Sequence, residues 1–225
     1  MVSKYVWGAS DSDYTRLEGD KTGRAKVPSP GTENTPEHQR YWMKMHNIFS
    51  TYLARAHETN ALAAIYQREF SKLLGDVPVG RWEAVAIYAL IKSTMFEAGT
   101  ITLLGPRVLS TTPGFHKLFW DHDGKLANLL FGMPSWLDPK PCRLRDAFHA
   151  ACESYLYPAA EEFDWDGPDA IADWEPVFGS RVNRELIQFL RREAFTRRTV
   201  SGTISSLFVV GYVSRFLASS PRNLL

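Results

Sequence analysis

Two side chains in the first quarter of the chain have types and a spacing that could bind an anion. Trp42 and His46 are four residues apart in a segment with helical apolar periodicity, so both would project from the same side of one helix. An indole N–H and an imidazole that becomes cationic on protonation could together cradle a negatively charged cofactor group. Alternatively, Trp42 anchors the helix to the core and His46 lies half-exposed beside it. The spacing alone favours this second interpretation, and both stay open.

Side chains that could ligate a metal form no recognisable motif. The histidines lack i, i+4 pairing with a carboxylate partner, and Cys142 and Cys152 do not form a C-x-x-C pair. Three aspartates surround Gly167, but this glycine is misplaced for an EF-hand loop. We therefore predict no metal site and interpret residues 158–176 as an ordinary polar loop. The histidines are His38, His46, His57, His116, His122 and His149, and the aspartates are Asp164, Asp166 and Asp169.

The sequence also lacks the signatures of several common enzyme classes. It has no phosphate-binding loop, no dinucleotide-binding glycine fingerprint, no G-x-S-x-G nucleophile turn and no H-E-x-x-H pair. These absences remove support for nucleotide hydrolysis, nicotinamide-dependent redox chemistry, serine hydrolysis and zinc proteolysis. We predict no catalytic residue within this chain.

Charge and cysteine content exclude further classes. The 26 Lys and Arg residues nearly balance the 25 Asp and Glu residues, so no global field attracts nucleic acid. The arginines between residues 181 and 198 are interleaved with Glu185 and Glu193, which favours a solvated helix face over nucleic-acid binding. Two cysteines are too few for a disulfide-stapled secreted domain. We predict an intracellular protein that does not bind nucleic acid.

The elements that must position these residues are helices. With 225 residues, of which 44% are hydrophobic, the chain can form a sizeable core. Residues 8–36 are rich in Gly and Pro and predict an irregular lead-in. Thr35 and Pro36 then have the types of an N-cap and a first helical residue, and the apolar periodicity continues to Tyr52. A second helix is predicted over residues 62–73.

The next segments are more apolar. Residues 81–104 are apolar on nearly every face, which predicts a helix at the centre of the core, with the run Ala84 to Ile91 uninterrupted. Helical stripes recur over residues 115–129, 144–155 and 182–190, and no strand pattern competes with them. The sequence therefore predicts a single all-α unit.

Residues 199–214 form the longest candidate for a membrane segment. They carry no charge, but they are shorter than the roughly 20 residues that a transmembrane helix needs and are interrupted by small polar residues. We therefore expect a buried helix here and no membrane span.

Several short motifs follow one another in a distinctive order. They are His57 to Leu62, Met95 to Gly105, Gly105-Pro106, Pro113, Phe119-Trp120 to Asp123, Gly132 to Pro139 and Arg145-Asp146. In this order they resemble the cytochrome P-450 superfamily, in the branch that contains sterol 7-alpha-hydroxylases, prostacyclin synthase and their fungal relatives. The resemblance extends from about Tyr5 to about Val210 and is carried by the order of the segments more than by any one of them.

The resemblance implies haem as the cofactor. In this family a helix with a W-x-x-x-R motif donates hydrogen bonds to a haem propionate, and the matching residues here are Trp42 and His46, with His in place of Arg. The resemblance also implies a lipophilic small-molecule substrate, an NADPH-dependent reductase as partner, and association with the endoplasmic reticulum. Without that implication, a cytoplasmic location is expected.

The family holds its haem iron through a cysteine in an F-x-x-G-x-x-x-C-x-G loop, which this sequence does not contain. We therefore expect a multi-helix partial P-450 fold that lacks the C-terminal haem-thiolate half. Residues 1–35 would be an irregular lead-in, 36–210 the helical body and 211–225 a divergent tail. Without that half, the apolar faces of residues 84–91 and 199–210 are expected to be exposed.

Three functions agree with these expectations. The first is a fragment of a haem-dependent monooxygenase that acts on a sterol-like molecule or a secondary metabolite and is inactive alone. The second is a truncated, non-catalytic pseudoenzyme. The third is a helical interaction scaffold that uses Arg181 to Arg198 as its docking surface.

Overall fold

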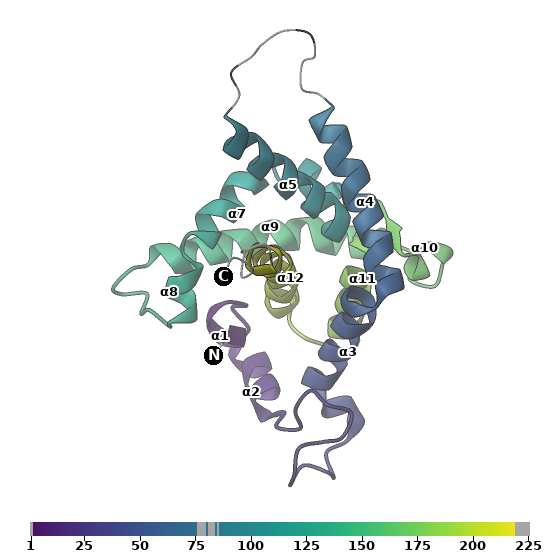
Figure 1. Cartoon of the computed structure of the whole chain (residues 1–225). Coiled ribbons are helices and arrows are strands. Elements are labelled where there is room, and N and C mark those ends of the chain that lie inside the picture. Colours follow the sequence, from purple (N-terminus) through teal and green to yellow (C-terminus); the bar gives the residue numbers. More distant parts are fainter. Residues whose placement is uncertain (1, 76–79, 81–83, 85, 219–225) are drawn as a thin grey trace, which may run out of the picture.

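The structure is a computed structural model that describes residues 2–75, 80, 84 and 86–218, with only the backbone described for residues 2, 3 and 208–218. It contains 68% helix and 2% strand, which confirms the predicted all-α class. The long helix α9 (Lys140–Glu162) crosses the middle of the molecule (Figure 1). The helices α4 (Ala56–Leu74) and α5 (Ile87–Leu104) lie above it in this view, and the N-terminal elements lie below.

The N-terminal residues are more regular than expected. They form α1 (Val2–Tyr5) and α2 (Asp11–Gly19). The Ser10 hydroxyl caps α2 by accepting a hydrogen bond from the Asp13 backbone N–H, which satisfies one of the free donors of the first turn. The prediction of an irregular segment over residues 8–36 is therefore wrong for α2, because its Ser–Asp–Ser–Asp start is a capping sequence that the surrounding glycines obscured.

The helix that carries Trp42 begins later than predicted. A short 3-10 helix, η1 (Glu37–Gln39), precedes α3 (Tyr41–Ala54). Pro36 rather than Thr35 is the residue before η1, and no side chain caps either helix. The predicted helix is otherwise confirmed, as is the second one, which is α4.

The prediction for residues 81–104 is partly wrong. Residues 81–83 and 85 lie outside the described part of the chain. Of the rest, Ile87 is 73% exposed and Tyr88 is 72% exposed, so the start of α5 is not the centre of the core. The buried part of α5 is its second half, where Phe96 is 1% and Leu104 0% exposed.

Short helices connect α5 to α9, as the glycines and prolines in this region indicate. They are α6 (Arg107–Thr111), α7 (Phe115–Asp123) and α8 (Leu126–Leu130). Phe96 of α5 lies 5.0 Å from Phe119 of α7, and Phe115 lies 5.3 Å from Phe148 of α9, measured between ring centroids. This aromatic cluster joins the three helices.

The predicted loop over residues 158–176 is shorter than expected. Pro158 lies within α9, which continues to Glu162. A short helix, α10 (Pro168–Ile171), follows. The absence of strands was also predicted wrongly, because β1 (Trp174–Glu175) and β2 (Gly179–Ser180) form a small antiparallel hairpin. Two-residue strands are too short to show an alternating sequence pattern.

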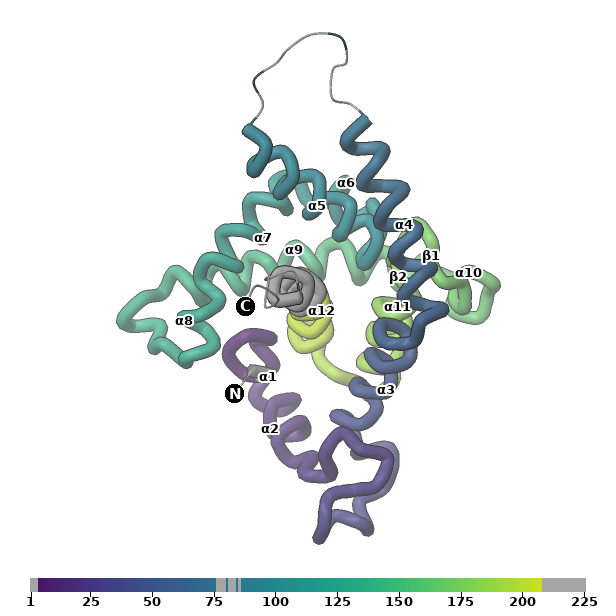
Figure 2. The backbone as a smooth tube through the Cα atoms, viewed as in Figure 1, coloured from purple at the N-terminus to yellow at the C-terminus, as the bar shows by residue number. Residues whose placement is uncertain are grey.

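The chain ends with α11 (Arg181–Arg192) and α12 (Arg197–Ala218). The start of α12 packs against α9, and the tube in Figure 2 shows it at the centre of the molecule. Val200 and Ile204 are fully buried, as are their small polar neighbours. The expectation that residues 199–210 are exposed is wrong for 199–207, and the side chains of 208–210 lie outside the described part.

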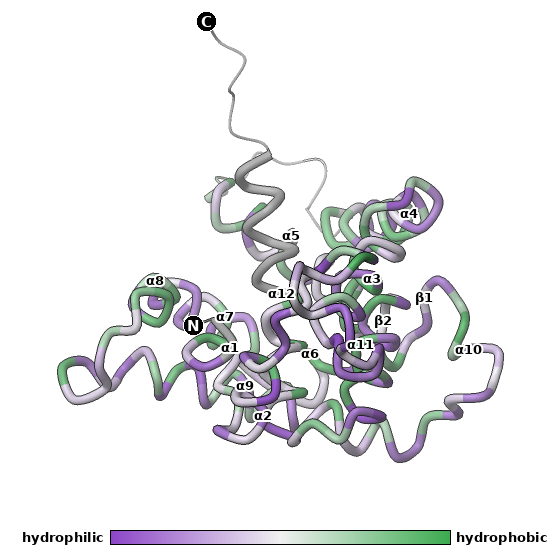
Figure 3. The backbone as a smooth tube through the Cα atoms, turned by 90° about the horizontal axis from the view of Figure 1, so that it is seen from below, coloured by the Kyte–Doolittle hydropathy of each residue, from purple (hydrophilic) through white to green (hydrophobic). Residues whose placement is uncertain are grey.

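Hydropathy is unevenly distributed over this framework. Figure 3 shows α8 as a hydrophobic segment at the side of the molecule. The loop after it exposes Phe131 by 87% and Trp136 by 83%. Within the described residues, no helix combines the length and the apolar character that crossing a bilayer requires.

Candidate functional site

Trp42 joins α3 to α2. Its indole N–H donates to the Leu17 carbonyl oxygen at 2.8 Å, and its backbone N–H donates to the Asp20 carboxylate at 3.0 Å. Its ring lies 5.8 Å from the ring of Trp7. The one polar atom of the indole therefore already has a protein acceptor, as in the anchoring interpretation of this residue.

His46 lies one turn further along α3, and its side chain is exposed. An anion could reach this imidazole from solvent, whereas the Trp42 N–H would first have to leave Leu17. The structure therefore does not present the two groups as a ready pair of donors. A propionate-binding role for Trp42 and His46 stays a prediction.

A buried cation near these residues escaped sequence reasoning. Arg40, at the start of α3, donates to the Thr22 hydroxyl at 3.2 Å and to the carbonyl oxygens of Ala25 and Lys26 at 2.6 and 2.9 Å. These hydrogen bonds from the guanidinium hold the segment before α3 in place. No local pattern indicated this role, because the acceptors lie 14 to 18 residues before Arg40 in the sequence.

The described residues do not fit an axial ligand for haem. Cys152 lies inside α9 with 0% exposure, and burial raises the pKa of its thiol to about 12, so it stays protonated at neutral pH. Cys142, on the first turn of the same helix, is half-buried and also free. Within the described residues, no group of three or more His, Cys, Asp or Glu side chains could hold a metal ion.

Two buried imidazoles lie near α9. His122, at the end of α7, is 1% exposed, and His149, in α9, is 4% exposed. Neither ring nitrogen of His122 has a hydrogen-bond partner within the described part of the chain, whereas the Val6 backbone interacts with the imidazole of His149. Burial, with the charge of Arg145, lowers the pKa of His122 to about 4 and that of His149 to about 3. Both rings are neutral at physiological pH.

Sequence reasoning considered these histidines only as metal ligands. Each is a single histidine on an otherwise apolar helix face, which is no signal for a buried pair. The neighbouring ring of Phe148 stacks on His122, with 5.1 Å between ring centroids. Only the packing of α7 on α9 brings the two imidazoles into one buried region.

The arginine-rich face of α11 is not uniformly solvated. Arg184 is 1% exposed and forms an ion pair with Glu175 of β1 at 3.1 Å. Glu175 also accepts hydrogen bonds from the backbone N–H groups of Val177 and Phe178 at 2.7 Å. The prediction of a solvated face is wrong for Arg184, because the β hairpin covers it. The same prediction is consistent with the exposure of Arg191 and Arg192.

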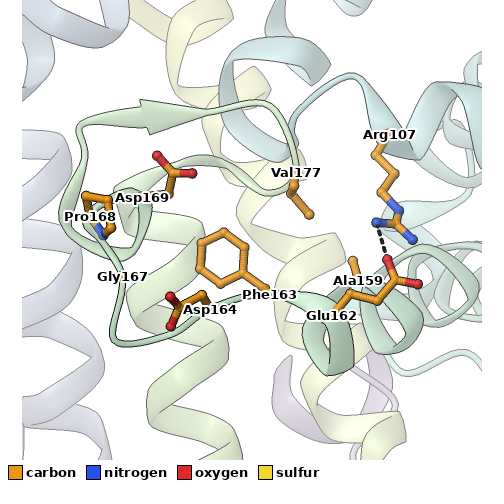
Figure 4. A pocket seen from close by; sticks show the side chains of 9 residues that line it. All are labelled: Arg107, Ala159, Glu162, Phe163, Asp164, Gly167, Pro168, Asp169 and Val177. Carbon is orange, nitrogen blue, oxygen red and sulfur yellow. Dashed lines mark hydrogen bonds and ion pairs between the residues drawn. The ribbon is translucent and has the colours of Figure 1, made fainter.

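A cavity of about 360 Å³ lies where α9 ends (Figure 4). Arg107 bridges to Glu162 across its rim at 3.1 Å, and Phe163 and Val177 provide an apolar wall. Asp164 and Asp169 line the same space. The Asp164 carboxylate accepts a hydrogen bond from the Asp166 backbone N–H at 3.1 Å, so it also shapes the turn. The cavity combines apolar and acidic groups without forming a metal-ligand cluster.

Comparison with known proteins identifies relatives of one kind. The chain is 37% identical over 210 residues, or 93% of its length, to cytochrome P-450 monooxygenase calL of Penicillium decumbens. It is 28% identical over 73% of its length to cytochrome P-450 monooxygenase fsoE of Humicola fuscoatra, and 23% identical over 61% to cytochrome P-450 monooxygenase efuG of Hormonema carpetanum. No family model and no solved structure matches the chain.

This mostly helical chain, which is similar over most of its length to these proteins, belongs to the cytochrome P-450 superfamily. The chain spans 39% of the length of the Penicillium relative, 27% of the Humicola relative and 25% of the Hormonema relative. The three matches confirm the superfamily to which the motif order pointed. The narrower branch of sterol 7-alpha-hydroxylases and prostacyclin synthase stays a prediction.

Proposed function

We propose that this chain forms the substrate-access part of a cytochrome P-450 monooxygenase, with residues 36–210 as one helical body. The observation that carries the proposal is the 37% identity over 93% of the chain to a cytochrome P-450 monooxygenase. When bound, haem supplies oxygen activation in such enzymes. The described residues contribute walls and positioning, because the sequence lacks the family's cysteine loop and burial keeps the Cys152 thiol protonated.

The proposed substrate is a lipophilic small molecule, either sterol-like or a secondary metabolite. The support is the family relationship together with the uncharged sequence from residue 199 to residue 214. Val200 and Ile204 pack the start of α12 into the core, so this helix could form a rigid apolar wall. Apolar walls with few polar groups are typical of sites for such ligands.

For the haem itself, His46 is the better candidate of the two residues. Its exposed imidazole can approach a propionate from solvent. Trp42 could join it only by exchanging its Leu17 acceptor for the propionate. Its present bond instead makes Trp42 a residue that fixes α3 relative to α2.

An NADPH-dependent reductase is the proposed electron donor, and the endoplasmic reticulum surface is the proposed location. Both follow from the family relationship. The loop after α8 supports contact with a membrane surface, since Phe131, Trp136 and Leu137 are exposed by 87, 83 and 63%. Lys140 follows this loop at the start of α9, and Lys125, just before α8, lies 3.9 Å from Asp138 of the loop. Aromatic residues beside cations suit the boundary between lipid headgroups and acyl chains.

Two spectroscopic measurements test this function. The purified chain, mixed with haem, reduced and exposed to carbon monoxide, should not give a thiolate-type Soret band. A chimera in which residues 5–210 replace the matching segment of the Penicillium relative should give that band. A thiolate-type band from this chain alone, lost in Cys142→Ser or Cys152→Ser, would contradict the proposal that this chain does not supply the haem ligand.

The propionate role needs its own control. His46→Ala in the chimera should weaken haem retention, whereas His57→Ala, which removes an exposed histidine from α4, should not. Equal retention in both variants would show that His46 does not contact the cofactor. A chimera that folds by circular dichroism but binds no haem would remove the proposed function itself.

A further inference from the structure

Residues 5–8 run from the last residue of α1 into the connection to α2, where Val6 is buried, Trp7 packs against the ring of Trp42, and two arginines hold the backbone. Arg145 of α9 donates to the Tyr5 carbonyl oxygen at 2.8 Å, and Arg198 of α12 donates to the Gly8 carbonyl oxygen at 2.6 Å. We call residues 5–8 the strap. It is attached to two helices that are far away in the sequence.

One carboxylate joins the two arginines. The Asp146 Oδ1 atom accepts hydrogen bonds from Arg145 at 2.9 and 3.0 Å and from Arg198 at 2.9 Å. We call Arg145, Asp146 and Arg198 the clamp. The Asp146 and Arg198 side chains are 48% and 51% exposed, so water and salt reach their ion pair. Such pairs contribute little net stability and are readily loosened.

The strap approaches α12 very closely. A Cβ atom built on Gly202 would overlap the Trp7 carbonyl oxygen, so only glycine permits this contact. Gly8 has a φ of +57°, a left-handed conformation that turns the chain toward α2. The backbone of the strap therefore lies directly on the helix, without side chains between them.

His149 lies beneath this contact. Its ring is 3.3 Å from an ideal Cβ on Gly8 and 3.1 Å from one on Gly202, so both glycines border the same imidazole. Within the described residues the ring nitrogens of His122 have no hydrogen-bond partner, and the Val6 backbone of the strap is the group that favours a proton on His149. A buried polar atom without a partner costs free energy, which water would recover on entry.

We propose that the strap is a gate which opens and closes over the His122–His149 region, with the clamp as its latch. The Asp146–Arg198 pair is the exposed part of this attachment, whereas Arg145 is buried, so loosening of the exposed pair is the step that would release the strap. When it opens, it admits solvent or a small polar molecule between α9 and α12. This inference stands on the described contacts and does not depend on monooxygenase activity.

The experiment measures the accessibility of His149 in the full chain. Diethyl pyrocarbonate labels neutral imidazoles, and mass spectrometry reports each histidine separately. In Asp146→Asn, the labelling rate of His149 should rise by about tenfold, because Arg145 and Arg198 lose their shared charged acceptor. Amide hydrogen exchange of residues 5–8 should accelerate in parallel.

Two controls separate gate opening from unfolding. Asp121→Asn removes an exposed carboxylate that pairs with Lys117 on α7, and it should leave His149 labelling unchanged. Alkylation of Cys152, which is fully buried one turn from His149, reports opening of the core. It should stay slow in Asp146→Asn while His149 becomes reactive.

If a variant does not fold, a measurement on the unmodified chain still tests the gate. Raising the salt concentration to about 1 M should accelerate His149 labelling, since it screens the exposed ion pair. Asp146→Asn should lack this salt response. The gate is refuted if His149 labelling is insensitive to both changes, or if Cys152 alkylation rises together with it.

Discussion

Residues 199–207 at the start of α12 and residues 87–91 at the start of α5 are both uncharged helical segments, yet they have opposite environments. Val200 and Ile204 are fully buried, whereas Ile87 and Tyr88 are more than 70% exposed. The second segment is the more apolar of the two in sequence. Apolar composition therefore predicted the helices but not which of them the core would contain.

The difference comes from neighbours and from polar satisfaction. The α12 segment contacts α9, α11 and α5, and Gly202 lets the backbone of Trp7 approach. Its hydroxyl groups donate to carbonyl oxygens of the preceding turn, for example Thr203 to Thr199 at 2.8 Å, so burial leaves no unmet donor. Small polar residues thus allow close packing that a larger apolar side chain would prevent.

The largest effect is expected from acid, which acts on the buried side chains of His122 and His149 and not on the exposed start of α5. The pKa values of His122 and His149 are about 4 and about 3, below the ordinary 6.5. At pH values between 6.5 and these lower values, the unfolded chain therefore binds more protons than the folded chain. The free energy of unfolding should therefore fall as the pH decreases below about 6.5. Between pH 6.5 and 4.5 the loss is on the order of 5 kcal/mol, or less where the strap opens locally.

The charged groups around His149 also lower its pKa, in agreement with this pH dependence of stability. Arg145, Arg198 and His122 all disfavour its protonation, and only the Val6 backbone favours it. Denaturant melts at several pH values provide the measurement. His122→Phe should make the pH dependence shallower, and His57→Phe on exposed α4 should not. A stability that is flat from pH 6.5 to 4.5 would show that the imidazoles are already hydrated in the folded state.

The second prediction concerns the buried ion pair between Arg184 and Glu175. Arg184→Ala leaves Glu175 buried and without its counter-ion, which should lower the free energy of unfolding by about 3–5 kcal/mol. Arg192→Ala, on the exposed end of the same helix, should change it by less than about 0.5 kcal/mol. Chemical denaturation compares the two, and equal effects would place Arg184 in contact with solvent.

The smallest effect is expected on the exposed segments. Tyr88→Ser and Trp136→Ser should each change the free energy of unfolding by less than about 0.5 kcal/mol, because these side chains are 72% and 83% exposed. Trp136→Ser should in addition weaken binding to anionic lipid vesicles, and Tyr88→Ser should not. A loss of stability in Tyr88→Ser would mean that the start of α5 is covered in solution.

Local sequence patterns predicted much of the secondary structure. Apolar periodicity predicted α3, α4, α9 and α11, and Gly105-Pro106 correctly marked the end of α5. Motif order predicted the superfamily, which the relatives confirm. These features depend on residues close in the chain or on their order, so no tertiary information is needed to recognise them.

Other features depended on which segments meet in space. Arg184 becomes a buried ion pair only because β1 and β2 fold over α11, and Trp42 loses its free N–H only because Leu17 lies beside it. The clamp joins Arg145 and Asp146 to Arg198 and holds Tyr5 of the strap, although these residues lie far apart in the sequence. Burial and hydrogen-bond partners are set by the packing of distant segments, and a local pattern contains no record of that packing.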